Sequence, residues 1–233
     1  MEDWQEREEL LIGKDNIEKL KNATVAVFGC GGVGSYAVEA LARAGIGNFV
    51  LVDKDVVDVT NINRQLVADF STIGRDKVEV EKERILRVNP DANVEIHKEF
   101  YCEENKEKLI REDYTYIVDA IDSVSSKLSL IITAHEKNVK IISAMGMGNK
   151  LDPTQIEVSD ISKTSVCPLA KTIRKQLRAN GINHLKVVYS RELPNRFDKS
   201  EENRRTTASI SFVPSAGGLI IASQIVRDLI DEF

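Results

Sequence analysis

Short apolar segments of strand length alternate with longer segments of helical spacing along the first 150 residues. Strands are expected at residues 24–29, 48–53, 93–100, 114–122 and 140–146. Helices are expected at residues 14–22, 35–47, 77–89 and 130–138. Continuous apolar runs are typical of strands that are buried on both faces of a sheet. This alternation predicts an α/β fold with a Rossmann-like, doubly wound and mostly parallel sheet.

The pattern changes after residue 148. Residues 156–163 and 186–192 are expected to form strands, the first of them antiparallel, and the basic segment 171–181 is expected to form a helix. Residues 194–209 are polar and are predicted as a mobile loop. Residues 209–230 are predicted as a strand, a turn and an apolar helix. We therefore divide the chain at residue 150 and expect residues 151–233 to extend the same sheet with a mixed or antiparallel part.

Composition narrows the class of protein. The 233 residues are 42% hydrophobic and 30% charged, which is typical of a globular chain. The net charge is −5, so any basic surface must be local. Cys30, Cys102 and Cys167 are far apart, which argues against a disulfide framework and against a thiolate zinc site. The acidic N-terminus and the absence of a long apolar run predict a soluble, cytoplasmic protein without a membrane segment.

A glycine-rich turn follows the first predicted strand and opens a helix. It contains Gly29, Gly31, Gly32 and Gly34, and Asp53 ends the next strand 24 residues after Gly29. Glycines let the backbone approach a phosphate, the helix N-terminus offers free N–H groups, and a carboxylate at the second strand can accept ribose hydroxyls. The turn therefore predicts a nucleotide site for NAD, FAD or ATP. The alternative is a glycine turn that is needed only for packing.

A series of polar residues beyond the second strand favours phosphate chemistry over hydride transfer. The members are Asp53, Asp55, Asn61, Arg64, Gln65, Lys77 and Asp122. Arg64 and Lys77 can neutralise charge that develops on transferring phosphates, and a hydride-transfer enzyme has no evident need for them. Asp122, at the carboxyl end of a strand, can hold Mg²⁺ with phosphates as co-ligands. Structural alternatives are a solvated Lys77, an Arg64 that pairs with Asp55, and an aspartate that caps a helix.

The ordered motifs GxGGxG, VDxD, NxxRQ, GxxK and DxxD resemble the ThiF-type adenylyltransferases over residues 10–150. The resemblance implies an ATP-binding, Rossmann-like domain with an N-terminal helical arm over residues 1–150. It implies that the four glycines line the ATP site, that Asp53 binds ribose, and that Asp122 binds Mg²⁺. It places Asn61, Arg64, Gln65 and Lys77 around the phosphates, and Asp55 is a further candidate residue for cofactor binding. It also implies a homodimer in which an N-terminal arginine, matched here by Arg7, enters the partner's site.

The second part lacks the Cys-x-x-Cys pairs of members that activate sulfur-carrier proteins. Instead, residues 152–164, 167–178, 187–194 and 209–226 resemble the tRNA threonylcarbamoyladenosine dehydratases. One departure is Cys167, where the resemblance leads us to expect an aspartate. Residues 171–205 carry ten basic and four acidic side chains, which is the charge asymmetry of a nucleic-acid contact. The alternative is an ordinary basic helix face. We expect tRNA to bind Lys171, Arg174, Lys175 and Arg178.

The resemblance implies an adenylate-forming enzyme that dehydrates, and thereby cyclises, threonylcarbamoyladenosine beside the tRNA anticodon. One alternative is an adenylyltransferase that activates the C-terminal glycine of a ubiquitin-like sulfur carrier. A second alternative is a NAD-binding dehydrogenase or a non-catalytic nucleotide-binding module. A monovalent cation, Na⁺ or K⁺, and a sulfur-transfer or redox partner protein remain open.

Overall fold

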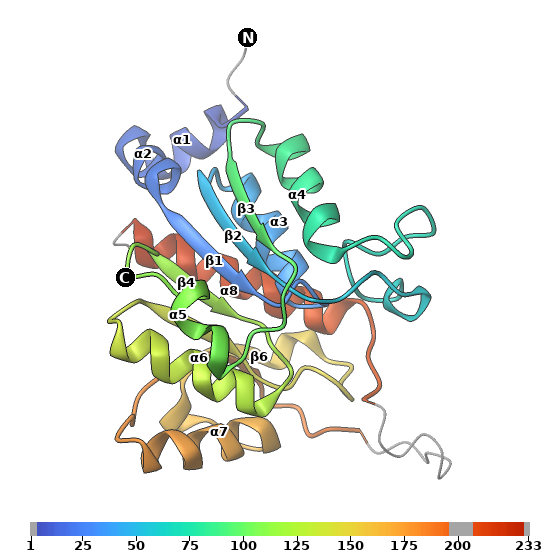
Figure 1. Ribbon diagram of the computed structural model, residues 1–233, viewed down its shortest axis with the longest axis vertical. Helices are drawn as coiled ribbons and strands as arrows, with labels where there is room; N and C mark the ends of the chain where they lie inside the picture. The colour runs from blue at the N-terminus through green and yellow to red at the C-terminus, as the bar shows by residue number, and fades with distance from the viewer. Residues whose placement is uncertain (1–3, 196–206, 231–233) are drawn as a thin grey trace.

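A single seven-stranded sheet runs through the computed structural model, which describes residues 4–195 and 207–230 (Figure 1). Its strand order is β3-β2-β1-β4-β5-β7-β6. The strands are β1 (Thr24–Phe28), β2 (Asn48–Val52), β3 (Asn93–His97), β4 (Tyr116–Asp119), β5 (Ile141–Ala144), β6 (Ile156–Asp160) and β7 (Lys186–Ser190). All neighbouring pairs are parallel except β6–β7, which is antiparallel. The predicted Rossmann-like fold class with a mixed C-terminal extension is confirmed.

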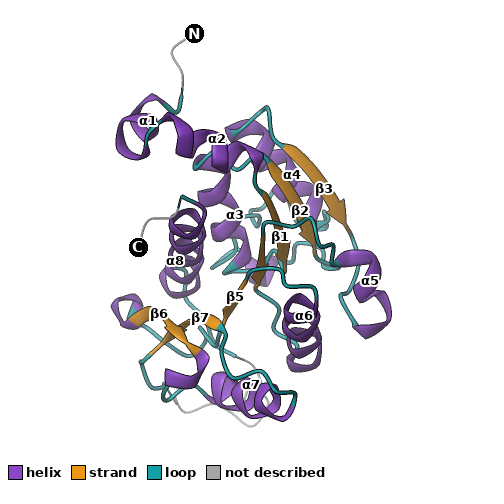
Figure 2. Cartoon of the chain, turned by 90° about the vertical axis from the view of Figure 1, so that its left-hand side faces the viewer, coloured by secondary structure: helices purple, strands orange, loops and turns teal. Residues whose placement is uncertain are grey.

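Helices cover both faces of the sheet (Figure 2). They are α1 (Glu6–Ile12), α2 (Lys14–Asn22), α3 (Gly34–Arg43), α4 (Lys77–Val88), α5 (Lys106–Leu109), α6 (Val124–Glu136), α7 (Pro168–Ala179) and α8 (Phe212–Leu229). Short 3-10 turns lie at Val59–Asn61, Glu103–Asn105, Pro153–Gln155 and Ile161–Lys163. Apolar residues of α2, α3, α4 and α8 pack on one face, and those of α5, α6 and α7 pack on the other.

Strand β1 contributes to both cores because successive side chains of a strand point to opposite faces. Val25 and Val27 belong to the core beneath α3 and α8, and Ala26 and Phe28 to the core beneath α5 and α6. All four side chains are fully buried. A strand that is buried on both faces therefore reads as the continuous apolar run from which it was predicted.

The strand expected at the start of residues 209–230 does not form. The chain is irregular up to Ser211, and α8 begins at Phe212 with Pro214 in its first turn, where proline is compatible with a helix. Val213, Gly217 and Ile221 recur every four residues on its buried side. These buried residues follow the period of a helix, so the segment is helical from Phe212. The strand was predicted from the short apolar start of the segment, and that prediction is wrong.

Other element boundaries also differ from the predicted ones. Helix α6 begins at Val124 instead of residue 130, because Ser123 precedes it in extended conformation and the polar first turn is helical. Helix α1 lies in the N-terminal helical arm that the resemblance implies, although the residue pattern alone placed no helix there. Strand β3 ends at His97 instead of residue 100. Most of the predicted loop 194–209 lies outside the described residues. The division at residue 150 stays a prediction, since strands from both parts pair in one sheet through β5 and β7.

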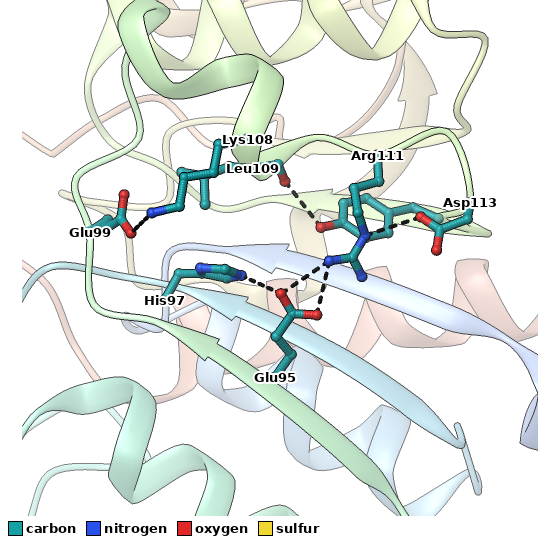
Figure 3. Close-up of polar contacts among 8 residues, drawn as sticks. Glu95, His97, Glu99, Lys108, Leu109, Arg111 and Asp113 are labelled. Carbon is teal, nitrogen blue, oxygen red and sulfur yellow. Dashed lines mark hydrogen bonds and ion pairs between the residues drawn. The ribbon is translucent and has the colours of Figure 1, made fainter.

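Strand β3 pairs with β2 on one side only, and an ionic cluster packs beside it (Figure 3). Glu95 accepts two hydrogen bonds from Nη1 of Arg111, at 3.0 and 2.9 Å, and its Oε1 lies 2.6 Å from Nε2 of His97. Arg111 also contacts Asp113 and lies over the ring of Tyr114. His97 therefore has a structural role on an edge strand.

Among the described helices, none has the length and apolar character that crossing a membrane requires.

Candidate functional site at the carboxyl edge of the sheet

The glycine turn connects the carboxyl end of β1 to the N-terminus of α3. Gly29 has a φ of +95°, and a Cβ atom there would lie 2.7 Å from the carbonyl oxygen of Ala120. A Cβ atom on Gly34 would lie 1.8 Å from the carbonyl oxygen of Gly29. These two glycines are required by the turn itself, because any side chain would separate α3 from the strand. The packing alternative is thus correct for part of the motif.

Gly31 and Gly32 face more open space. A Cβ atom on Gly31 would meet only the amide nitrogen of Gln65, at 3.9 Å. One on Gly32 would lie 3.3 Å from Pro214 and 3.5 Å from Arg64. The backbone N–H groups at the start of α3 therefore lie close to the side chains of Arg64 and Gln65, which follow β2. This arrangement fits a phosphate chain that runs between the turn and Arg64.

Asp53 closes the turn from the neighbouring strand. Its Oδ2 accepts a hydrogen bond from the N–H of Cys30 at 2.7 Å, and its Oδ1 accepts one from the N–H of Asp55 at 2.8 Å. Burial raises the pKa of the Asp53 carboxyl above its usual value, and these hydrogen bonds and the charge of Lys77 partly offset that rise. The carboxylate is therefore fixed in position beside the glycine turn, where each oxygen retains a second acceptor site for a sugar hydroxyl.

Lys77 begins α4 and reaches the same place. Its Nζ lies 3.1 Å from Oδ2 of Asp55, and its side chain is 6% exposed while that of Asp55 is 51% exposed. The structure therefore pairs Asp55 with Lys77 and not with Arg64. The guanidinium of Arg64 donates to the carbonyl of Thr60 at 2.8 Å and to Oδ1 of Asn63 at 2.9 Å. Both cations are held by oxygen acceptors that lie in exposed positions, so a phosphate can compete for them.

Asn61 and Gln65 are buried beside the turn. Oδ1 of Asn61 accepts from the N–H of Asp58, which closes the short turn Val59–Asn61. Oε1 of Gln65 is buried without a hydrogen-bond partner in the described part of the chain. An unpaired buried polar atom costs free energy, and a polar ligand can satisfy it. Ser35 of α3 accepts from the N–H of Leu66, so this segment is docked on the glycine turn.

Asp122 lies beyond the end of β4 and is exposed, whereas Asp119 at the end of the strand is fully buried. Asp119 Oδ2 accepts from Nζ of Lys127 at 2.8 Å and from the hydroxyl of Ser143. Lys127 also donates to the carbonyl of Ala144 at 3.0 Å. This buried group ties β4, β5 and α6 together under the loop that carries Asp122. The sequence did not lead us to predict this buried pair. The feature that could have indicated it is Asp119, an aspartate in an otherwise apolar strand.

Arg7 lies on the exposed side of α1 and is not part of this constellation. Helix α2 leads directly into the amino end of β1, so α1 and α2 lie at the sheet edge opposite the glycine turn (Figure 1). A role of Arg7 within the site of its own chain is therefore excluded by its position. Its role in a partner's site stays a prediction.

The basic residues of α7 differ in their surroundings. Nη1 of Arg174 donates to the carbonyls of Ile161 and Thr164 at 3.1 and 3.0 Å and to the hydroxyl of Thr164 at 2.6 Å. It is half-buried and holds the turn after β6. Three other basic side chains are exposed along the same helix: Lys171, Lys175 and Arg178. They are spaced by four and three residues and so follow one face. Binding of tRNA by α7 stays a prediction, and Arg174 has a structural task as well.

Comparison with known proteins decides the family, because residues 6–232 match the ThiF family model. The chain belongs to the ThiF family. It is 44% identical to a tRNA threonylcarbamoyladenosine dehydratase of Bacillus subtilis strain 168, over 97% of this chain and 94% of that protein.

Solved structures agree with this ThiF-family membership. The crystal structure of E. coli tRNA N6-threonylcarbamoyladenosine dehydratase with AMP superimposes with a TM-score of 0.91 at 32% identity, covering 99% of this chain and 96% of that one. Its complex with ATP gives a TM-score of 0.90 with the same identity and coverage. Similarity to the yeast adenylyltransferase and sulfurtransferase UBA4 is more limited, at 33% identity over 64% of this chain and 34% of that protein.

Proposed function

We propose that this protein is an ATP-dependent dehydratase of tRNA that carries threonylcarbamoyladenosine. The observation that carries the proposal is the similarity to the B. subtilis dehydratase, which extends over 97% of the chain and so includes the part after residue 150. The nucleotide site alone would fit any adenylyltransferase. Complexes of the E. coli relative with ATP and AMP support ATP as the nucleotide and AMP as its product.

In the proposed reaction, the threonyl carboxylate attacks the α-phosphorus of ATP, and pyrophosphate leaves. An atom of the carbamoyl group then attacks the acyl carbon, AMP leaves, one proton is released and a ring closes with net loss of water. No enzyme nucleophile is needed. The protein positions the reactants and stabilises charge that develops on the phosphates. Arg64 offers a planar fork and Lys77 a point charge beside the glycine turn.

Mg²⁺ fits the exposed carboxylate of Asp122. One protein carboxylate together with phosphate oxygens and water is a common magnesium environment. When bound, the ion would neutralise charge on the phosphates. Asp122 lies beside the loop that follows β4, and the buried Asp119–Lys127 pair fixes this loop. No cluster of three or more potential metal ligands occurs among the described residues, so phosphate oxygens and water would supply most of the ligands.

We also propose a homodimer in which Arg7 of one protomer completes the site of the other. Support comes from the position of Arg7 at the sheet edge opposite its own glycine turn. Mixing Arg7→Ala protein with Lys77→Ala protein tests this arrangement. If Arg7 acts across the interface, mixed dimers contain one intact site and regain activity that neither variant has alone. A mixture as inactive as its two components would contradict the proposed dimer.

A cytoplasmic location also stays a prediction.

The direct test of the proposed function is mass spectrometry of tRNA nucleosides after incubation with the protein, ATP and magnesium. The expected result is loss of one water mass from threonylcarbamoyladenosine, with release of AMP and pyrophosphate. Arg64→Ala and Lys77→Ala are each expected to lower adenylation by at least about 100-fold while the protein stays folded. Arg87→Ala, an exposed position on α4, serves as the matched control. Unchanged nucleosides with the parent protein would contradict the proposal.

Two other activities can be distinguished from the proposed one by pyrophosphate exchange and by the variants of Arg64 and Lys77. An enzyme that activates a carrier protein would show pyrophosphate exchange that a C-terminal glycine peptide stimulates and modified tRNA does not. A NAD-dependent or nucleotide-sensing protein would tolerate loss of Arg64 and Lys77. The buried Lys77, ion-paired beside the glycine turn, favours phosphate chemistry over these alternatives.

A further inference from the structure

Three lysines are buried among the described residues, and only one of them has no acidic partner. Lys77 pairs with Asp55, and Lys127 pairs with Asp119. Lys150 is 4% exposed, and its Nζ donates one hydrogen bond, to the carbonyl of Ser190 at 3.0 Å. An ammonium group has three N–H donors. Lys150 therefore keeps two donors unused in a buried position.

The groups that surround Lys150 do not supply the missing acceptor. The carboxylate of Glu192 accepts from the N–H groups of Leu151 and Asp152, at 2.8 to 3.0 Å, and from the side-chain amide of Asn195. The remaining titratable neighbour is the thiol of Cys167. Burial lowers the pKa of Lys150, and the nearby Cys167 and Glu192 oppose this effect only in part. Within the described residues, this amine therefore has no ion-pair partner, although the charge of Glu192 acts on it from a longer distance.

Lys150 lies on the same edge of the sheet as the nucleotide site. It follows β5, whose carboxyl end is parallel to that of β4, and it bonds to the last residue of β7. The first half of α8 connects the two places. A Cβ on Gly32 of the glycine turn would lie 3.3 Å from Pro214, and a Cβ on Gly217 would lie 3.1 Å from Met147, three residues before Lys150. Lys150 therefore lies on the side of the nucleotide site that β5, β7 and the first half of α8 form.

We propose that Lys150 is an anion-binding residue for the RNA substrate. Its two unused N–H groups bind an anionic oxygen of the modified nucleotide, either the threonyl carboxylate or a phosphate beside it. The inference rests on the proposed function, because that function supplies an acidic substrate at this edge. The substrate's anion then takes the place that Asp55 and Asp119 occupy for the other two buried lysines.

The structural cost of the arrangement supports a role in binding. A buried polar group without partners destabilises a fold, and such groups persist where a ligand needs them. Replacement of Lys150 by methionine, which has a similar length and no polar group, should leave stability unchanged or raise it. The same replacement at Lys127 leaves Asp119 as a buried, unpaired charge and should lower stability. The two lysines thus separate a ligand-binding role from a structural one.

The experiment compares Lys150→Met and Lys127→Met with the parent protein. Thermal unfolding is measured first. Dissociation constants are then measured for tRNA with threonylcarbamoyladenosine and for the same tRNA without the modification. For Lys150→Met we expect an unchanged or higher melting temperature and about 10- to 100-fold weaker binding, the range for a hydrogen bond to a charged group.

The two RNAs identify which oxygen is bound. Weaker binding of only the modified tRNA assigns the threonyl carboxylate, and equal weakening for both RNAs assigns a phosphate. Unchanged affinity of Lys150→Met for both RNAs overturns the proposal, as does a fall in melting temperature as large as that of Lys127→Met. A parent protein that binds neither RNA would instead contradict the proposed function itself, which separates the two failures.

Discussion

The region around the glycine turn and the face of α7 organise their polar groups in opposite ways. Around the turn, Asp53, Asp55 and Lys77 bind one another or the backbone before any ligand is present. On α7, Lys171, Lys175 and Arg178 are exposed and have no such partners among the described residues. The first arrangement fixes a small ligand by geometry. The second is the arrangement that we expect to attract a large polyanion by charge, with a contribution that depends on salt.

This difference corresponds to the two parts of the proposed substrate pair. ATP has a defined shape, and a phosphate that is misplaced by a small distance does not react. The RNA backbone is long and repeats its charge, so exposed and adaptable cations suffice to hold it. Arg174 is the exception on α7, because its guanidinium is bound by three acceptors around Thr164 and Ile161. The comparison can be tested with variants at the glycine turn and with variants on α7.

The largest expected effect comes from adding one methyl group inside the glycine turn. A Cβ at Gly34 would lie 1.8 Å from the carbonyl oxygen of Gly29. Gly34→Ala should lower the free energy of unfolding by at least about 3 kcal/mol or prevent folding, because neither backbone can move away. Gly31→Ala is the matched control, since only Gln65 lies near the added atom, at 3.9 Å. It should fold normally and weaken ATP binding, measured by calorimetry; equal stability of both variants would refute this view of the turn.

The next effect concerns the buried pair beneath the Asp122 loop. Lys127→Met leaves Asp119 without its counter-ion in a fully buried position. The free energy of unfolding should fall by roughly 3 to 5 kcal/mol in chemical denaturation. The double variant Lys127→Met/Asp119→Asn should recover part of this loss, because the unpaired charge is removed. If the single and double variants were equally unstable, the charge of Asp119 would not be the cause.

A smaller effect is expected on α7. Reversal of Lys175 and Arg178 to glutamate should weaken tRNA binding about tenfold and flatten its salt dependence by about one unit for each lost phosphate contact. Binding of ATP should not change, because the glycine turn lies on another part of the sheet. A double variant with Arg87→Glu on α4 and Lys14→Glu on α2, both exposed positions, controls for the same change in net charge. A salt series in which the parent and the double variant have the same slope would remove RNA binding from α7.

The smallest effect tests the one unpaired acid near the glycine turn. Glu81 on α4 is fully buried, and neither carboxyl oxygen has a partner in the described part of the chain. Burial raises its pKa well above 4.5, although the charge of Arg84 opposes this. The folded state therefore binds more protons than the unfolded state between 4.5 and the folded pKa. Its contribution to stability is complete below 4.5 and is lost as the pH rises through the folded pKa.

Glu81→Met should remove this pH dependence and raise stability near neutral pH by about 1 kcal/mol, the cost of an unsatisfied buried group. Chemical denaturation of parent and variant at several pH values between 5 and 8 measures the difference. The gap between the two proteins should widen with pH. A constant gap would mean that Glu81 does not change its protonation in this range.

Much of the fold could be predicted because local pattern and burial agree. Strand β1 reads as buried on both faces and is so. The start of α6 was missed because Ser126 and Lys127 are polar in sequence yet buried in the structure. The partner of Lys127, Asp119, comes from the neighbouring strand β4. Such positions cannot be inferred from hydrophobic periodicity, because their environment depends on a contact between separate elements.

The sequence indicated which residues the candidate site contains, but it did not indicate which hydrogen bonds and ion pairs these residues form. The motifs identified the glycines, Arg64 and Lys77, and the structure brings them together at one edge of the sheet. They did not indicate that Asp55 would pair with Lys77, or that Arg174 would hold the turn at Thr164. Lys150 was not singled out, because a lone lysine in a loop is ordinary in sequence. Its burial and its missing counter-ion are properties of the folded chain.

The contact between α3 and α8 determines when the molecule can finish folding. A Cβ on Gly218 would lie 2.3 Å from the carbonyl oxygen of Val33, so these helices touch backbone to backbone across more than 180 positions of chain. Contacts of such long range form late, because closing the intervening chain costs entropy. A ribosome that has released only the first half of this sequence presents α3 with its apolar face uncovered. The nascent nucleotide-binding half must therefore wait for the last helix before it is protected from aggregation.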